Sequence, residues 1–204
     1  MFRPASLISA TALLLSLAAC GGGKTSNSPP VDTGPSPEYR ALMQDVGAAR
    51  LSESGFIETD FSELPTSGSA SYDGVAVYRQ VGDVRPAVIW EGDNAQVASR
   101  VSMGVDFGAR TVRGKADRFH EIGSGRRLDG ELDISAGIGG GGYGVDLARV
   151  RGSVGGRIAS DGSTTEVGGE FIGGFSDGTG RLAGILELQT PDGNWQGLVD
   201  TRRD

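Results

Sequence analysis

The segment Arg151–Leu188 decides the fold class, and it reads RGSVGGRIASDGSTTEVGGEFIGGFSDGTGRLAGILEL. Short runs of alternating apolar residues are interrupted every few positions by glycine or by a cluster of Gly, Asp, Ser and Thr. No interval between these clusters is long enough for a helix. Alternating runs joined by tight turns predict an antiparallel meander of strands.

Glycine is unusually abundant in the chain as a whole. It accounts for 35 of the 204 residues, whereas the usual share is about 7%. There is no collagen period, so we interpret the glycines as turns and bulges that need a positive φ. Aromatic residues make up only 6% of the chain, which predicts a small core built mainly of Val, Leu and Ile.

The charge balance excludes one class of partner. The formal net charge is −7, and removal of a signal segment that contains only Arg3 leaves 18 basic and 26 acidic residues, a net charge of −8. Binding to a phosphate backbone needs a basic stripe. Nucleic acid is therefore not an expected partner.

The first twenty residues, MFRPASLISATALLLSLAAC, have the layout of a secretory signal. One cation, Arg3, precedes the apolar stretch Leu7–Leu17, and small residues follow. The stretch is shorter than the roughly 20 residues that span a bilayer. The end of the segment, LAAC, resembles the bacterial lipobox, whose cysteine thiol receives a diacylglyceryl group and becomes the new N-terminus. We predict a lipoprotein signal peptide over 1–19 and lipidation of Cys20.

The alternative at this position is an ordinary secretory signal with an incidental cysteine. Cys20 is the only cysteine, so no disulfide framework is expected. Gly21 follows it, and resemblance to enteric sorting signals implies export to the bacterial outer membrane. Residues 20–37 are then the lipidated cysteine and a flexible tether rich in Gly, Ser and Pro. A tether of this kind reaches an r.m.s. span of about 20–25 Å, enough to hold a domain away from the membrane surface.

A single short helix is predicted after the tether. Ser36, Pro37 and Glu38 have the form of a helix start, with a capping hydroxyl, a proline in the first turn and then an acid. The next apolar residues recur at helical spacing: Tyr39, Leu42, Met43, Val46 and Ala49. We assign 38–67 to a helix of about ten residues and a lead-in segment, and expect the helix to cover one end of the sheet.

From Gly68 onward the strand pattern is continuous. The candidate strands are Ser69–Gln80, Pro86–Glu91, Ala95–Phe107, Thr111–Ala116, Leu128–Ser135, Tyr143–Arg149, Gly152–Ala159, Glu166–Phe175, Arg181–Gln189 and Asn194–Thr201. After short pieces are merged, eight strands remain, the number that closes into a small barrel with a filled interior. The predicted fold class is all-β: an eight-stranded antiparallel soluble β-barrel over 68–204, with a short N-terminal helix.

Alternation also predicts which residues face inward and which face outward. The inward candidates are Tyr72, Val75, Val77, Val101, Met103, Val105, Phe107, Val112, Leu132, Ile134, Val145, Leu147, Val154, Ile158, Val167, Phe171, Leu182, Ile185, Leu186, Trp195 and Leu198. Charged residues occupy the predicted outward positions: Asp73, Arg79, Arg100, Asp106, Arg113, Asp133, Arg149 and Glu187. A membrane-spanning barrel needs an unbroken apolar outer band, so this alternative is not expected.

Two stretches near the start of the predicted barrel, TSGSASYDGVAVYR (66–79) and SRVSMGVDFGARTVRGK (99–115), carry a family likeness. They show a Tyr-x-Gly strand and a Val-Asp-Phe strand that turns into Thr-Val-x-Gly. Further on, GSVGGR (152–157) and EVGGEF (166–171) match closing strands of the same pattern. From Gly68 to the C-terminus the chain resembles the lipoprotein barrel of transferrin-binding protein B and factor H-binding protein. The resemblance implies an outer-membrane or surface lipoprotein scaffold.

The chain departs from this family at two points. Where relatives often carry an aromatic Phe-Tyr-Gly turn, Arg157–Thr165 reads RIASDGSTT, without an aromatic residue. We expect this segment to be a polar, flexible loop in which the function differs from that of relatives. The chain is also too short for the two lobes of the transferrin receptor, so transferrin binding is not inherited.

Two glycine motifs are not interpreted as cofactor or metal sites. Gly137, Gly139 and Gly142 fit G-x-G-x-x-G, but the helix that a dinucleotide site requires does not follow. Residues 141–146, GGYGVD, fit the opening of a calcium-binding repeat, which works only in stacked copies, and there is one copy. We expect no cofactor and no metal.

The single histidine, His120, lies in DRFHE (117–121). No G-x-S-x-G elbow is present for a serine hydrolase, and zinc would need several N or S ligands. We expect an exposed histidine in a turn. The alternative is that His120, with Arg118, Arg126 and Arg127 nearby, ligates haem or grips an anionic partner.

The function that we predict is a non-catalytic binding module, an outer-membrane or surface lipoprotein that acts through a rigid scaffold. The alternatives are a structural or assembly lipoprotein of the periplasmic envelope and, third, a lipid-anchored hydrolase. The aromatics that could anchor a partner are Trp90, Tyr78, Tyr143 and Trp195; core packing is an equal alternative for each of them and the favoured one for Trp195. The predicted contacts to a host protein, an envelope protein or a small ligand such as haem are His120, Arg118, Tyr143 and Trp90.

Overall fold

The computed structural model describes residues 34–51, 57–82, 90, 92–141 and 146–204. These residues belong to one compact unit, Gly34–Asp204. The predicted signal peptide, Cys20 and most of the tether lie outside the described residues, as does Tyr143. The assignment of 1–19 and 20–37 therefore stays a prediction.

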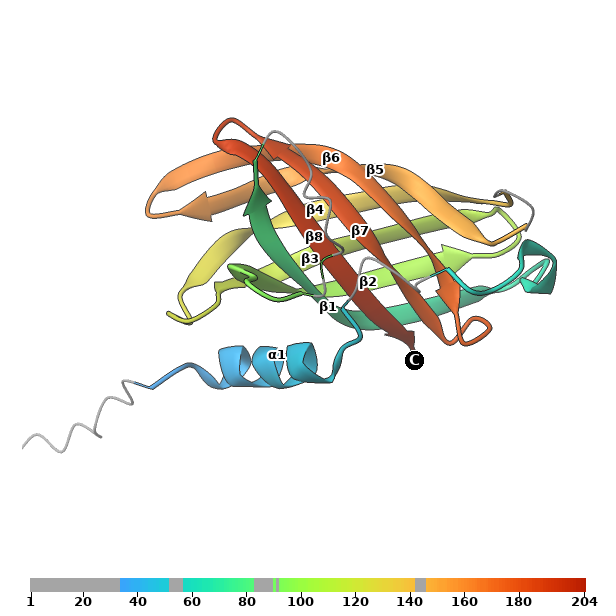
Figure 1. Ribbon diagram of the computed structural model, residues 1–204, viewed down its shortest axis with the longest axis horizontal. Helices are drawn as coiled ribbons and strands as arrows, with labels where there is room; N and C mark the ends of the chain where they lie inside the picture. Colours follow the sequence, from blue (N-terminus) through green and yellow to red (C-terminus); the bar gives the residue numbers. More distant parts are fainter. Residues whose placement is uncertain (1–33, 52–56, 83–89, 91, 142–145) are drawn as a thin grey trace, which may run out of the picture. The chain divides into compact units, whose positions relative to one another are not determined.

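Eight consecutive antiparallel strands close into a barrel, as predicted (Figure 1). The elements are α1 (Pro37–Ala48), the 3₁₀ turn η1 (Phe61–Glu63), β1 (Ser69–Val81), β2 (Val97–Asp106), β3 (Thr111–Glu121), β4 (Arg127–Gly139), β5 (Arg149–Ser160), β6 (Ser163–Ser176), β7 (Arg181–Thr190) and β8 (Gly193–Arg203). Each strand pairs with the next, and β8 pairs with β1, from Tyr72 opposite Arg203 to Val81 opposite Asn194. Closure leaves the barrel without a free edge.

Eight of the ten candidate strands are the barrel strands, and two are not. Pro86–Glu91 lies outside the described residues except for Trp90, which is not in a strand. In the candidate Tyr143–Arg149, Leu147 makes only an isolated bridge to Asp60, and Arg149 begins β5. Among the described helices, none has the length and apolar character needed to cross a membrane.

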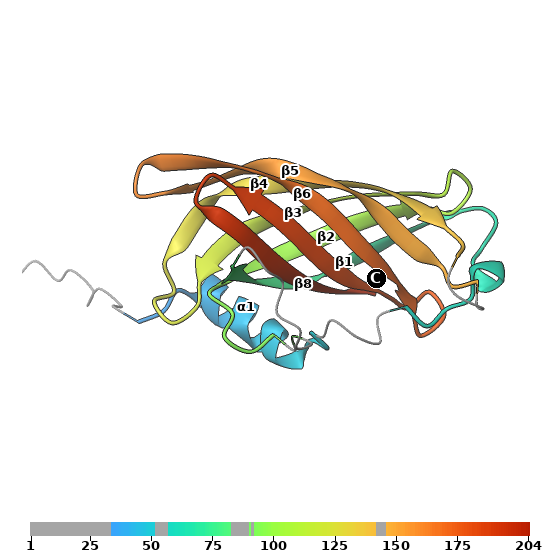
Figure 2. The ribbon, with the colours of Figure 1, turned by 45° about the horizontal axis from the view of Figure 1, so that its top comes forward.

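Helix α1 begins where the capping pattern predicts. The Ser36 side-chain oxygen accepts a hydrogen bond from the Tyr39 amide at 3.1 Å, and Pro37 occupies the first turn. Leu42 is the buried residue of the helix, 1% exposed. The helix lies against the outside of the barrel rather than across one end (Figure 2).

The barrel therefore has two apolar layers, one inside and one outside. The outside layer, here called the outer apolar strip, consists of Leu42, Val75, Val77, Trp90, Ala98, Ala183, Ile185 and Leu198. The prediction that Val75, Val77, Ile185 and Leu198 face inward was wrong, because a strand covered by a helix is buried on both faces. Alternation identifies the residues that share a face, but it does not say which face is the interior.

A buried ion pair fastens the segment after α1 to the sheet. Arg181 Nε lies 2.5 Å from Asp200 Oδ1, and the two side chains are 8% and 2% exposed. The Arg50 amide donates to the other Asp200 oxygen at 2.7 Å, and Arg181 donates to the Arg50 carbonyl at 2.5 Å. The charges are thus paired and their remaining hydrogen-bonding groups used, as burial requires.

The segment Arg157–Thr165 is not the flexible loop that we expected. Strands β5 and β6 continue through it, and the last pair is Ser160 opposite Ser163. Asp161 and Gly162 form the turn with φ values of 51° and 80°, the geometry that favours Asp-Gly in a two-residue hairpin. The segment is thus made of two ordered strand ends and the tight turn that joins them.

Turns and bulges explain only part of the glycine content. A Cβ added to Gly197 would lie 2.9 Å from Cδ1 of Tyr78, and one added to Gly173 would lie 2.6 Å from Cζ of Phe171. These glycines make room for aromatic rings inside a narrow barrel. The prediction missed this role because it depends on where each ring lies in the closed barrel: Tyr78 of β1 lies beside Gly197 of β8, and the Phe171 ring extends along β6 toward Gly173.

Candidate functional site

One half of the barrel interior is closely packed. Its large side chains are 0–3% exposed: Tyr72, Met103, Phe107, Phe171 and Phe175. The Phe175 ring lies 6.2 Å from that of Tyr72 and 6.0 Å from that of Phe107, centroid to centroid. The Tyr72 hydroxyl donates to the carbonyl of Thr179 at 2.8 Å. Among the described residues, these side chains pack closely against one another in this half.

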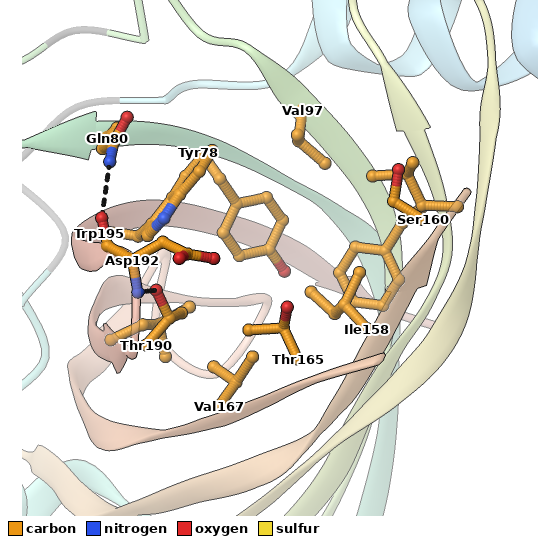
Figure 3. A pocket seen from close by; sticks show the side chains of 13 residues that line it. Tyr78, Gln80, Val97, Ile158, Ser160, Thr165, Val167, Thr190, Asp192 and Trp195 are labelled. Atoms are coloured by element: carbon orange, nitrogen blue, oxygen red, sulfur yellow. Dashed lines mark hydrogen bonds between the residues drawn. The ribbon is translucent and has the colours of Figure 1, made fainter. Parts of the chain in front are cut away.

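The other end of the interior opens into a cavity of about 280 Å³ (Figure 3). All eight strands contribute to it. We call it the mouth pocket, and its lining residues are Tyr78, Gln80, Val97, Phe119, Leu128, Ile158, Ser160, Thr165, Val167, Leu188, Thr190, Asp192 and Trp195. Apolar walls with a few polar groups at the opening are the usual composition of a small-ligand site, and barrel mouths are a usual place for one.

Tyr78 forms a rigid part of the pocket wall. Its ring lies 5.8 Å from that of Phe119, and its hydroxyl is 3.0 Å from the Ser99 hydroxyl. Burial raises the pKa of Tyr78 far above its ordinary value of 10, so the phenol stays neutral at every physiological pH. Tyr78 therefore presents an apolar ring to the pocket, with its hydroxyl already engaged.

Hydrogen bonds order the polar edge of the mouth pocket at the β7–β8 turn. Gln80 Nε2 donates to the Asp192 carbonyl at 3.1 Å. The Thr190 hydroxyl donates to the Gly193 carbonyl at 2.9 Å and accepts from the Asp192 amide at 3.3 Å. Within the described part of the chain, the Asp192 carboxylate and the Thr165 hydroxyl have no such partner. Both are free to contact a bound molecule.

His120 is not an exposed turn residue, so that expectation was wrong. It belongs to β3 and is 1% exposed. Its Nδ1 bonds the Gly125 carbonyl at 3.2 Å, and its ring lies 5.7 Å from that of Tyr39 in α1. A bulge at Arg118, whose φ is 52°, places Phe119 inside the barrel and His120 outside it, beneath the helix. His120 thus holds α1 against the barrel.

The other predicted contacts do not assemble into one site. Trp90 is 1% exposed, and its Nε1 donates to the Asp93 carbonyl at 2.5 Å. Arg118 is exposed and lies 3.2 Å from its neighbour Asp117. Arg126 is paired with Glu121 and Asp161, and Arg127 with Glu38. Among the described residues, no three His, Cys, Asp or Glu side chains gather as they would to hold a metal ion.

Sequence reasoning missed most of the mouth pocket, although it named parts of its wall. Tyr78 and Trp195, which were considered as partner anchors or core residues, both line it. So do Ile158, Ser160 and Thr165, which lie in the segment that departs from the family pattern. Four strands contribute a polar side chain near the end that faces the pocket, Gln80, Ser160, Thr165 and Thr190, but no motif connects these positions in the sequence.

No protein-family model and no curated protein matches the chain. A tryptophan-to-alanine mutant of transferrin-binding protein B, a vaccine antigen from Haemophilus parasuis Hp5, is similar in structure, with 16% identity over 72% of this chain and 28% of that one (TM-score 0.47). A double mutant of that protein shows 15% identity over 71% and 27% (TM-score 0.44). The N-lobe of lactoferrin-binding protein B from Moraxella bovis shows 13% identity over 69% and 61% (TM-score 0.36). The chain spans less than two thirds of each of these structures.

Proposed function

We propose that this protein is a lipid-anchored, non-catalytic binding module of the bacterial outer membrane, and that the mouth pocket is its binding site. The observation that carries the proposal is the contrast between the two ends of one barrel. One end is packed with rings, and the other leaves apolar walls from all eight strands around a cavity of about 280 Å³. Contact between water and apolar walls is unfavourable. An apolar ligand that displaces this water therefore binds with a favourable free energy.

The anchor half of the proposal depends on the first twenty residues. The LAAC ending and the tether that follows are the features that support lipidation of Cys20. The measurement is phase partitioning of the purified protein with a nonionic detergent. We expect the unmodified protein in the detergent phase and a Cys20→Ser variant made without the signal segment in the aqueous phase. Partitioning of that variant into detergent would contradict the anchor.

The pocket half can be tested with a neutral fluorescent dye such as N-phenylnaphthylamine. Trp195 lines the mouth pocket, so dye bound there should accept energy from its excited indole. Two adjacent threonines provide a matched pair of variants, because Thr165 lines the pocket and Thr164 is exposed on the outer face. We expect Thr165→Phe to weaken dye binding at least about tenfold, since the added ring occupies the cavity that the dye needs.

Thr164→Phe is the control, and it should leave the dye affinity unchanged. If both variants bind the dye as the unmodified protein does, the dye lies elsewhere and the assignment of the site is wrong. If the unmodified protein does not bind the dye at all, the pocket is not a general apolar site.

A further inference from the structure

The mouth pocket has a charge asymmetry that bears on its ligand. Among its thirteen lining residues, Asp192 is the only one that carries a charge at neutral pH, and none is Lys, Arg or His. The carboxylate has no hydrogen-bond or ion-pair partner among the described residues. Figure 3 shows its side chain directed from the β7–β8 turn toward the space between Tyr78 and Thr165. A ligand bound in the pocket therefore lies near this group.

We infer that the mouth pocket selects a neutral or cationic amphiphile with one short apolar chain or ring, and that Asp192 excludes anions. This inference rests on the proposed function, because it assigns the ligand class of the same pocket. The polar end of the ligand lies at the opening, where Asp192 accepts a hydrogen bond from an alcohol or ammonium group and Thr165 can donate or accept one. The apolar end lies against Phe119, Leu188 and Trp195.

The size of the pocket limits the apolar part. A volume of about 280 Å³ corresponds to about nine groups of the size of a water molecule, at roughly 30 Å³ each. A single chain of about eight carbons fits this volume, whereas the two chains of a phospholipid or the macrocycle of haem do not. Haem also carries anionic propionates, so both size and charge disfavour the haem contact that was considered from the sequence.

The polar groups of the wall favour this orientation over the reverse one. The ring of Tyr78 faces the pocket and its hydroxyl is already hydrogen-bonded to that of Ser99, so a buried head group would mainly meet the rings of Tyr78 and Phe119 there. A charged or hydroxylated end placed against those rings would lose its hydration without replacement, which is costly. At the opening, by contrast, the head group keeps water and gains Asp192.

The test uses three ligands that share an eight-carbon skeleton and carry a cationic, a neutral and an anionic head group: octylamine, n-octanol and octanoate. Each displaces N-phenylnaphthylamine from the protein as purified from cells, held in lipid nanodiscs if it is membrane-bound, with empty nanodiscs as the blank. An ion pair at a solvent-exposed site changes affinity by up to about fivefold. The favourable free energy of the cation and the unfavourable free energy of the anion both contribute to the difference between the two ligands. We therefore expect octylamine to bind about tenfold more tightly than octanoate at low salt, with the affinity of n-octanol between them.

Two variants with the same change in net charge provide the control. Asp192→Asn should bring the affinities for octylamine and octanoate to within about twofold of each other. Asp177→Asn removes a charge from the β6–β7 turn at the opposite end of β7 and should keep the tenfold difference. The difference in the unmodified protein should also shrink at high salt, because ions screen exposed charges.

The outcomes separate the two claims. If octanoate binds the unmodified protein as tightly as octylamine, or if Asp192→Asn leaves the difference intact, the charge selection is wrong and the binding function stands. If the dye binds but none of the three octyl compounds displaces it, the ligand class is wrong. If neither the dye nor any octyl compound binds, the proposed function itself fails.

Discussion

A methyl group added at Gly197 tests the packing that shapes the mouth pocket. The Cβ of a Gly197→Ala variant would lie 2.9 and 3.0 Å from Cδ1 and Cε1 of Tyr78, and 3.1 Å from Cβ of Leu186. Carbon atoms at their optimal separation are about 3.5–4.0 Å apart. The ring of Tyr78 must therefore move by several tenths of an ångström, and the free volume beside it is the mouth pocket.

The cost of this change follows from two effects. Overpacking a core position destabilises a protein by about 1–3 kcal/mol. Movement of the ring also weakens the bond between the Tyr78 and Ser99 hydroxyls, 3.0 Å apart, which is worth about 1 kcal/mol. Replacing glycine by alanine returns about 0.4–1 kcal/mol through the unfolded chain. We expect a net loss of about 2 kcal/mol in the free energy of unfolding, or roughly 4–8 °C in Tm.

Urea unfolding measures the loss, and the dye titration measures its effect on the site. Gly168→Ala is the matched control, because an added Cβ at this exposed position of β6 meets nothing within 4 Å. We expect Gly168→Ala to be as stable as the unmodified protein or slightly more stable, with full dye binding. If Gly197→Ala matches this control in both stability and dye affinity, the described contact between Tyr78 and β8 is wrong.

Two further predictions concern the ion pairs of the barrel. Asp200→Asn leaves the buried Arg181 guanidinium without its counter-charge and should lower the free energy of unfolding by about 3–5 kcal/mol; a loss below about 1 kcal/mol in urea unfolding would show that the pair is not buried. Arg126 lowers the pKa of both Glu121 and Asp161 by hydrogen bonding. A carboxylate with a lowered pKa stabilises the fold above its ordinary value of about 4 and loses this contribution as the pH falls through the lowered pKa. The Tm difference between the protein and Arg126→Gln should therefore be largest near neutral pH and disappear toward pH 2, and a difference that is constant over this range would argue against these contacts.

The fold class could be predicted because its causes are local. Although the tight Asp-Gly turn at 161–162 was expected to be part of a flexible loop, alternation in 152–159 and 166–175 predicted two neighbouring strands without reference to the rest of the chain. The same holds for the start of α1 at Ser36 and Pro37, where the cap satisfies amides within one turn. The number of strands predicted that they close into a barrel, and the structure confirms the closed barrel.

The placement of residues between elements could not be predicted, because it depends on partners far away in the chain. Val75 and Val77 are apolar because α1 covers them from outside, which alternation in β1 does not reveal. His120 faces outward because the bulge at Arg118 shifts the register of β3. Position 197 is a glycine because the ring of Tyr78, which is 119 positions earlier in the chain, occupies the space that a side chain would take.

The mouth pocket was missed for a similar reason. No motif marks it, and its wall combines one or two residues from the end of each strand with Asp192 from a turn. Only closure of the barrel brings these positions together. Binding sites that arise from the arrangement of many strand ends have no local sequence signal, whereas a nucleophile elbow or a metal motif does.

Methyl NMR of the protein during titration with n-octanol tests the central claim most directly. The account predicts saturable shifts of the methyl signals that line the mouth pocket: Val97, Leu128, Ile158, Val167 and Leu188. Methyl signals deep in the packed half should not move: Val105, Val112 and Leu182. Shifts spread evenly over both sets, or confined to the outer apolar strip, would contradict a ligand site in the mouth of the barrel.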